Sequence, residues 1–253
     1  MRALKDLMTQ RFAKATTSYE GAAKAQEAIA ERFLERLHVK GFPKGLRVLE
    51  VGCGTGLFSR PFQEMFSPSA LTLNDICPSV EEKVAPLCDA RTQFKAGDAE
   101  RLAFELSYDA LVSCSALQWF EAPQEFLARM AEPELTWIAF CAFGEGNMRE
   151  IKAVSGVGLS YPTKKAWARM VPEDFEVLVC EEERLTLWFD TPLDVLRHIK
   201  ATGVGGVTRV RWGKEALGAF CTAYVEAFES KGKVPLTYHP VYVIARRKPT
   251  RSR

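Results

Sequence analysis

The chain has 253 residues, of which 47% are hydrophobic and 26% are charged, and its formal net charge is +2. This composition is ordinary for a soluble globular protein. No apolar run approaches the ~20 residues that a membrane span requires, and the N-terminus has no apolar segment of the signal-peptide kind. We therefore expect a cytoplasmic protein without a membrane anchor.

Cysteine and histidine usage bears on redox and metal chemistry. The seven cysteines are odd in number and contain no C-x-x-C pair, which argues against a disulfide scaffold and against a zinc site. Only three histidines are present, and they are far apart in the sequence. We therefore expect no metal cofactor.

The first segment with a regular pattern is helical. Apolar residues recur at intervals of three and four from about residue 4 to residue 38, and Pro43 and Gly45 follow. This pattern predicts an N-terminal helical arm over residues 1–42. Tyr19 lies on that arm, either as a functional hydroxyl or as an aromatic that only packs.

A glycine-rich turn comes next. A buried strand, Val48 to Val51, runs into Gly52-Cys53-Gly54-Thr55-Gly56, and Glu50 precedes the first glycine by two residues. Glycines allow a sharp turn and a close approach of the backbone to a ligand. A dinucleotide site has its third glycine one residue later, and a carboxylate at Glu50 would repel phosphate. The ammonium and sulfonium of S-adenosylmethionine suit Glu50, so we assign Glu50, Gly52, Cys53, Gly54 and Gly56 to that cofactor.

Two further acids follow predicted strands at suitable distances. Asp75 ends the strand Leu71 to Asp75, the position at which a doubly wound sheet holds the ribose hydroxyls. Asp98 follows the strand around Phe94 and is assigned to the adenine amino group. Ile76 and Ala99, next to these acids, are expected in the same site. The alternative is that each Asp only forms a turn.

The fourth strand, Tyr108 to Ser115, is expected to direct its carboxyl end to the reacting methyl group, with Ser113 and Ser115 in the site. Strands and helices alternate to about residue 143, which predicts an α/β fold with a doubly wound parallel sheet. Residues 144–213 then break the rhythm and are expected to form a cap over the substrate. A closing helix and strand are expected over 214–253, all within one domain.

Several segments outside the glycine turn together resemble the malonyl-[acyl-carrier protein] O-methyltransferases of biotin synthesis. The quoted residues are Arg11-Phe12-Ala13, Tyr19 and Gln26; Ser113, Ala116-Leu117-Gln118-Trp119; Leu196 to Gly203; and Pro235 to Tyr238 with Val243 to Arg246. Ser115 and Gly205-Gly206 depart from the family pattern, which bears on substrate detail. Trp119 has packing as its alternative role.

The resemblance implies a Rossmann-like class I methyltransferase with a seven-stranded, mostly parallel sheet. It also implies methyl transfer to the free carboxylate of malonyl-acyl carrier protein or malonyl-coenzyme A. That carboxylate is ionised at pH 7 and needs no general base, only alignment and exclusion of water. Its charge needs a partner, and the candidates are Tyr19, Lys200, Arg209 and Tyr238, with Arg149 in addition.

Charge distribution favours a protein-borne substrate. Residues 190–253 hold 12 Lys and Arg against 5 Asp and Glu, and the rest of the chain is acidic on balance. A basic face would attract an acidic carrier protein, although a solvated basic tail is the alternative. The sequence pI of about 8.1 and the lack of a nucleic-acid-binding motif argue against nucleic acid. A methyltransferase for another small acid or a quinone, and a cofactor-binding module without activity, are the other functions considered.

Overall fold

The computed structural model describes residues 2–104, 107–203 and 213–249. The chain divides into two compact units. The sheet unit comprises Gln26–Ala142, Pro162–Glu182 and Val241–Arg253, and the helix-rich unit comprises Met1–Ala25, Phe143–Tyr161 and Glu183–Pro240. Residues 162–182, expected in the cap, therefore group with the sheet.

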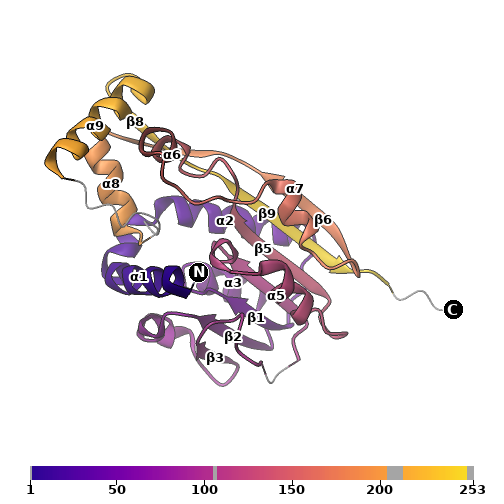
Figure 1. The fold of residues 1–253 in the computed structure, drawn as a ribbon. Coiled ribbons are helices and arrows are strands. Elements are labelled where there is room, and N and C mark those ends of the chain that lie inside the picture. The colour runs from indigo at the N-terminus through magenta and orange to yellow at the C-terminus, as the bar shows by residue number, and fades with distance from the viewer. Residues whose placement is uncertain (1, 105–106, 204–212, 250–253) are drawn as a thin grey trace. The chain divides into compact units, whose positions relative to one another are not determined.

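The sheet unit is built on seven strands in the order β3-β2-β1-β4-β5-β9-β6 (Figure 1). The strands are β1 (Arg47–Val51), β2 (Ala70–Asp75), β3 (Thr92–Ala96), β4 (Ala110–Cys114), β5 (Trp137–Phe143), β6 (Phe175–Glu182) and β9 (Pro240–Arg247). β1 pairs in parallel with β2 and β4, as do β2 with β3 and β4 with β5. β6 pairs with β9 in the antiparallel direction. The predicted doubly wound, mostly parallel sheet is confirmed.

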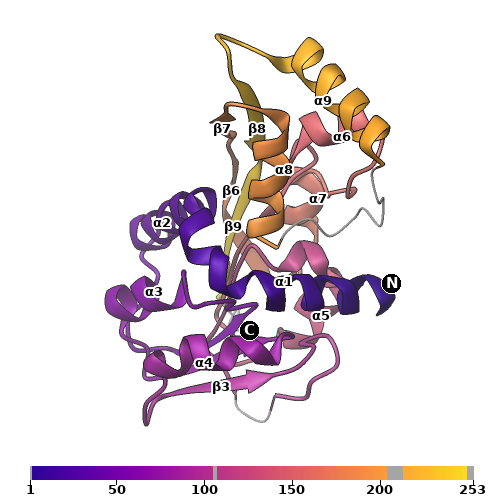
Figure 2. The ribbon, with the colours of Figure 1, turned by 90° about the vertical axis from the view of Figure 1, so that its left-hand side faces the viewer.

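The helices of this unit include those that connect parallel strands, because each parallel crossover needs a return segment. They are α2 (Lys24–Val39), α3 (Ser59–Phe66), α4 (Glu81–Val84), α5 (Pro123–Met130) and α7 (Lys164–Arg169), with short 3-10 turns η1 (Pro78–Val80), η2 (Ala85–Leu87) and η3 (Leu117–Trp119). α4 lies beside β3, as Figure 2 shows.

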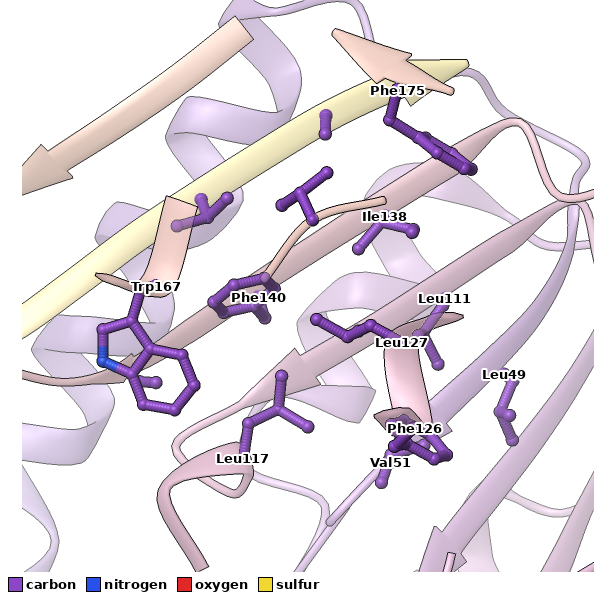
Figure 3. Close-up of a cluster of buried hydrophobic side chains, with 14 of the residues drawn as sticks. Leu49, Val51, Leu111, Leu117, Phe126, Leu127, Ile138, Phe140, Trp167 and Phe175 are labelled. Carbon is purple, nitrogen blue, oxygen red and sulfur yellow. The ribbon is translucent and has the colours of Figure 1, made fainter. Parts of the chain in front are cut away.

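The core of the sheet unit lies between the sheet and α5, η3 and α7. Figure 3 shows Leu49, Leu111 and Ile138 projecting from adjacent strands, and the same cluster includes Phe126 of α5 and Trp167 of α7, which lies beside Phe140. Each of these side chains is at most 2% exposed. Burying one such side chain contributes about 1.5–3 kcal/mol, so this cluster fixes the strands whose ends carry the site.

The helix-rich unit contains α1 (Arg2–Ala22), α6 (Arg149–Ser155), α8 (Pro192–Ala201) and α9 (Lys214–Phe228), with β7 (Leu185–Phe189) and β8 (Val234–Tyr238). α1 packs against α8, and α6 packs against α9 and β8. β7 and β8 form an antiparallel pair with Leu187 opposite Leu236.

Two local expectations need correction. The arm is not one helix, because the helical pattern stops at Ala23 between α1 and α2, just after Gly21, a residue that weakens helices. Residues 175–189, expected as part of the cap, form two strands, β6 and β7, which do not pair with each other. β6 pairs with β9 and β7 with β8, a strand that the sequence reading did not identify.

Candidate functional site

The candidate cofactor site lies where the sheet changes direction, between β1 and its two neighbours β2 and β4. From β1 the chain adds β2 and β3 on one side and β4 and β5 on the other. Helices then leave the carboxyl ends of β1 and β4 on opposite faces, so a ligand finds space above those ends. The loop after β1 is fixed there because the amides of Gly52 and Cys53 both donate to the carbonyl of Asn74, at 2.8 and 3.0 Å.

Each glycine of the turn has a positive φ: +74° at Gly52, +53° at Gly54 and +83° at Gly56. A Cβ on Gly52 would lie 2.1 Å from the Cβ of Ala116, in the loop after β4. The first glycine is therefore required by both backbone conformation and packing. Ala116 is a packing partner that the sequence alone did not connect with the turn.

Glu50 is 1% exposed, and its Oε1 accepts a hydrogen bond from Ser59 Oγ at 2.8 Å. Its Oε2 has no hydrogen-bond partner among the described residues. Burial raises the pKa of Glu50 to about 8, the nearby Asp75 carboxylate adds to the rise, and the Ser59 bond opposes it. Glu50 is thus a buried carboxyl group with one oxygen available to a cationic ligand. Ser59, at the start of α3, is a site residue that sequence reasoning missed.

Asp75 holds the glycine turn in addition to any role with a ligand. Its Oδ2 accepts from the amide of Gly54 at 2.9 Å, and its Oδ1 accepts from the amide of Cys77 at 2.8 Å. Burial raises the pKa of Asp75, and these two amide bonds act in the opposite direction. A carboxylate has further lone pairs after accepting two bonds, so ribose hydroxyls can still be accepted.

The residues expected around the adenine differ in exposure. Ile76, directly after Asp75, is 37% exposed although it follows a buried strand. Asp98 is half-buried; its Oδ1 accepts from the amide of Glu100 at 3.1 Å, and Arg101 Nε lies 3.6 Å from its Oδ2. Ala99 is buried. An exposed apolar side chain and a partly exposed carboxylate suit the face and the amino group of a purine.

Ser113 and Ser115, at the end of β4, both have structural roles. The buried Ser113 Oγ donates to the carbonyl of Val51 at 2.9 Å and so ties β4 to β1. Ser115 has a φ of +60°, which is uncommon for a residue other than glycine and marks strain at the strand end. Its carbonyl accepts from Gln118 Nε2 at 2.6 Å. Trp119, in η3, is half-buried.

Cys53 is a buried member of the turn rather than a nucleophile. Burial raises its pKa well above the ordinary value for a thiol, and the nearby Glu50 and Asp75 carboxylates add to that rise. A protonated, buried thiol is unreactive at neutral pH. Cys53 therefore contributes its backbone and its small volume to the turn.

Two negative findings apply to the part of the chain that the structure describes. There, no group of three or more His, Cys, Asp or Glu side chains is arranged to hold a metal ion. No described helix has the length and apolar character needed to cross a membrane.

The residues expected to hold the substrate carboxylate fall in the helix-rich unit. Tyr238 is completely buried and its hydroxyl lies 2.9 Å from His198 Nε2. Burial lowers the pKa of His198, which keeps the imidazole neutral at pH 7. Lys200 is exposed, and the half-buried Tyr19 packs edge-on against Phe12 with ring centroids 5.3 Å apart.

Two further candidates differ in what the structure says of them. Arg149 is exposed, and its Nε lies 3.2 Å from Oε1 of the buried Glu150. Arg209 lies outside the described residues. The helix-rich unit thus brings Tyr238 and His198 together and engages Arg149 in an ion pair, and the substrate roles of all these residues stay predictions.

The chemistry of the sheet-unit site fits S-adenosylmethionine. The glycine turn presents backbone without side chains to a ligand, the buried Glu50 has an oxygen without a partner among the described residues and so available to an ammonium, and Asp75 ends β2 at the position expected for the ribose. A phosphate-containing cofactor fits poorly, because the carboxyl groups of Glu50 and Asp75 line the same turn.

The sequence was compared with known proteins. Residues 48–132 match the family described as "Methyltransferase domain". A protein named "Malonyl-[acyl-carrier protein] O-methyltransferase" from Bacteroides thetaiotaomicron is 36% identical over 96% of this chain and 98% of its own length. A protein of the same name from Bacteroides fragilis is 39% identical over 96% of this chain, which spans half of that relative's length.

The fold has counterparts among solved structures. Magnesium protoporphyrin IX methyltransferase from Synechocystis, solved with bound S-adenosylhomocysteine, matches 92% of this chain and 86% of its own with a TM-score of 0.55 and 12% identity. That similarity concerns the fold, and the methyltransferase domain supports S-adenosylmethionine as the cofactor. Because the identity with the Bacteroides thetaiotaomicron relative extends over nearly the whole of both chains, this chain belongs to the malonyl-acyl-carrier-protein O-methyltransferase family.

Proposed function

We propose that this protein transfers a methyl group from S-adenosylmethionine to the free carboxylate of malonyl-acyl carrier protein. The product would be the malonyl methyl ester that starts the pimeloyl part of biotin synthesis. The observation that carries the proposal is the 36% identity to a malonyl-[acyl-carrier protein] O-methyltransferase across 98% of that relative. The acid-lined glycine turn supports the methyl-transfer part independently.

The proposed reaction needs no general base from the protein. The cofactor, when bound, supplies an electrophilic methyl group on a sulfonium. The nucleophile is a carboxylate with a pKa near 4, so it is ionised at pH 7 without a base. The chain's own task is to align the two reactants and exclude water, which accounts for a site without a histidine beside a carboxylate.

Within the sheet unit the proposed roles follow the contacts. Glu50 pairs with the cofactor's ammonium through Oε2, Asp75 accepts the ribose hydroxyls while holding Gly54, and Asp98 accepts the adenine amino group. Ile76 lies against the purine. Ser59 contributes by orienting Glu50.

For the substrate, we propose that Tyr19, Lys200, Tyr238 and Arg209 supply the donors that hold the malonyl carboxylate. A buried anion without a partner would be costly, and each of these side chains carries a donor. The Tyr238 hydroxyl lies 2.9 Å from His198 Nε2, and it can donate to the carboxylate when that nitrogen is the donor of the pair. The domain plan of a helical arm, a core, a cap and a closing segment is proposed on the same basis.

Mass spectrometry of the carrier protein tests the reaction. Malonyl-acyl carrier protein incubated with enzyme and S-adenosylmethionine should gain one methyl group as an ester. Acetyl-acyl carrier protein is the matched control, because it has the same thioester and carrier but no free carboxylate. Methylation of both, or of neither, would contradict the proposal, and methylation of free malonate or a quinone instead would identify the alternative substrate classes.

The carrier is tested separately. We propose that the basic residues 190–253 attract the acidic carrier protein, so Arg209→Glu with Arg211→Glu should raise KM for malonyl-acyl carrier protein more than for malonyl-coenzyme A. The wild-type preference should shrink as salt rises, since exposed charges are screened over about 8 Å at physiological ionic strength. Equal losses with both substrates would assign these arginines to the malonyl carboxylate, and no loss would leave the basic residues a solvated surface.

A further inference from the structure

Gln26, in the first turn of α2, has a buried carboxamide without hydrogen bonds to the described residues. It is 4% exposed, and neither its Nε2 nor its Oε1 has a hydrogen-bond partner among the residues that the structure describes. A buried amide without partners destabilises a fold, and native proteins rarely retain one without a reason. A carboxamide offers donors and an acceptor on adjacent atoms, so a ligand that satisfies it should carry both kinds of group.

The direction of α2 can be read from the aromatic contacts of Phe33, within the helix, and of Phe42, beyond its C-terminal end. Phe42, just after α2, contacts Trp137, the first residue of β5, with ring centroids 5.4 Å apart. Phe33 stacks on Phe58, which immediately precedes α3 and follows the glycine turn, at 5.3 Å. α2 therefore runs from the carboxyl edge of the sheet, where the cofactor site lies, toward the opposite edge.

Gln26 lies seven residues before Phe33, which is two helical turns and the same face of the helix. At 1.5 Å per residue it is about 10 Å beyond Phe33 along the axis, on the side of the carboxyl edge. Ala30 and Leu37 continue the same buried stripe. The geometry thus brings Gln26 to the level of the ends of β1 and β2, where Glu50 Oε2 is likewise buried without a partner among the described residues.

We propose that the carboxamide of Gln26 binds the amino-acid end of S-adenosylmethionine. Its Nε2 donates to the cofactor's α-carboxylate, and its Oε1 accepts from the ammonium, which Glu50 Oε2 also contacts. A zwitterion is the chemical class that satisfies a carboxamide and a carboxylate together. The inference rests on the cofactor and not on the malonyl substrate, so its failure would leave the proposed methylation standing.

Ligand truncation tests this role. S-adenosylhomocysteine carries the amino-acid end, and 5′-methylthioadenosine has the same nucleoside and sulfur without it. In calorimetry, Gln26→Met should weaken S-adenosylhomocysteine binding about ten-fold or more while changing the Kd of methylthioadenosine less than about two-fold. Gln26→Glu, which faces the α-carboxylate with a negative charge, should weaken S-adenosylhomocysteine further.

Stability without ligand provides a second readout. Because Met removes an unsatisfied buried amide at nearly equal volume, unliganded Gln26→Met should have a Tm equal to or above that of the wild type. The matched control is Gln63→Met: Gln63 Nε2 donates to Leu87 O and Thr92 Oγ1, so its loss should lower Tm and leave the ratio of the two ligand affinities unchanged. Equal losses with both ligands, unchanged binding of S-adenosylhomocysteine, or a lowered Tm in Gln26→Met would each overturn the proposal.

Discussion

Glu50 in the sheet unit and Glu150 in the helix-rich unit are both buried, at 1% and 0% exposure, yet their surroundings differ. Glu150 accepts from the amide and the hydroxyl of Thr237 and from Arg149 Nε, so both of its oxygens have partners. Glu50 accepts one bond, from Ser59. Burial alone therefore does not identify a functional carboxylate. What distinguishes Glu50 from Glu150 is an oxygen atom without a hydrogen-bond partner among the described residues.

The largest expected loss of stability is that of the Glu150→Ala variant. Glu150→Ala leaves the amide and hydroxyl of Thr237 buried without an acceptor, which should lower the free energy of unfolding by about 3–5 kcal/mol. Urea denaturation measures the loss. Glu50→Ala, as the counterpart, removes one hydrogen bond and should destabilise the unliganded protein much less. Equal destabilisation by both variants would contradict the distinction.

A second prediction concerns the turn that carries Glu50. Gly52→Ala places a Cβ 2.1 Å from that of Ala116 at a φ of +74°, and we expect a loss of about 2–4 kcal/mol together with loss of cofactor binding. Thermal unfolding and calorimetry give the two quantities. The double variant Gly52→Ala with Ala116→Gly should recover part of the stability, since it relieves the clash and retains the unfavourable φ. No recovery would mean that Ala116 is not the obstacle.

The pH dependence of Glu50 sharpens the comparison. Its pKa is raised from 4.5 to about 8 in the fold, so the folded protein holds a proton that the unfolded chain releases. The resulting stabilisation is complete below about pH 4.5 and is lost as the pH rises through about 8. Between pH 6 and pH 9 the unliganded wild type should lose about 2–3 kcal/mol that Glu50→Gln retains.

The same titration should appear in ligand binding. The cofactor's ammonium favours ionised Glu50, so the affinity of the wild type for S-adenosylhomocysteine should rise from pH 6 to about pH 8 with release of a proton. Calorimetry in buffers of different ionisation enthalpy detects that proton. An affinity that rises equally in Glu50→Gln would assign the proton to another group.

The smallest expected effect is at Asp75. Asp75→Asn keeps one carbonyl acceptor for the amides of Gly54 and Cys77 but removes the charge, so the Kd for S-adenosylmethionine should rise about ten-fold, or about 1.4 kcal/mol. Calorimetry measures it, and circular dichroism checks the fold. An unchanged Kd would reduce Asp75 to a structural partner of the turn.

The cofactor site of the sheet unit could be predicted from sequence because the motifs that form it are local. A strand, a glycine turn and an acid at each strand end follow one another within a few residues, and the parallel sheet brings those ends together. Ser59 and Ala116 were missed because their roles depend on contacts across the turn. No local sequence pattern predicts that Ser59, nine residues after Glu50, donates a hydrogen bond to its carboxylate.

The helix-rich half was less readable for a related reason. Antiparallel pairing of neighbouring strands is the usual expectation, yet β7, which ends at Phe189, pairs with β8, which begins only at Val234. β8 contains Pro235, a residue that disfavours strands, and its pairing with β7 stabilises it nonetheless. The roles of Tyr19, Lys200 and Tyr238 depend on the substrate, and they stay predictions.

The place of β9 has a consequence for synthesis on the ribosome. β9 is made after the other six strands of its sheet, yet it lies between β5 and β6. Until residue 247 has left the exit tunnel, the apolar strand Trp137–Phe143 has an open edge, and β6 has no neighbour in the sheet. Open apolar edges of nascent chains invite aggregation. Translation speed and chaperone supply while β9 is being made should therefore govern the yield of native protein more than events during synthesis of the cofactor core.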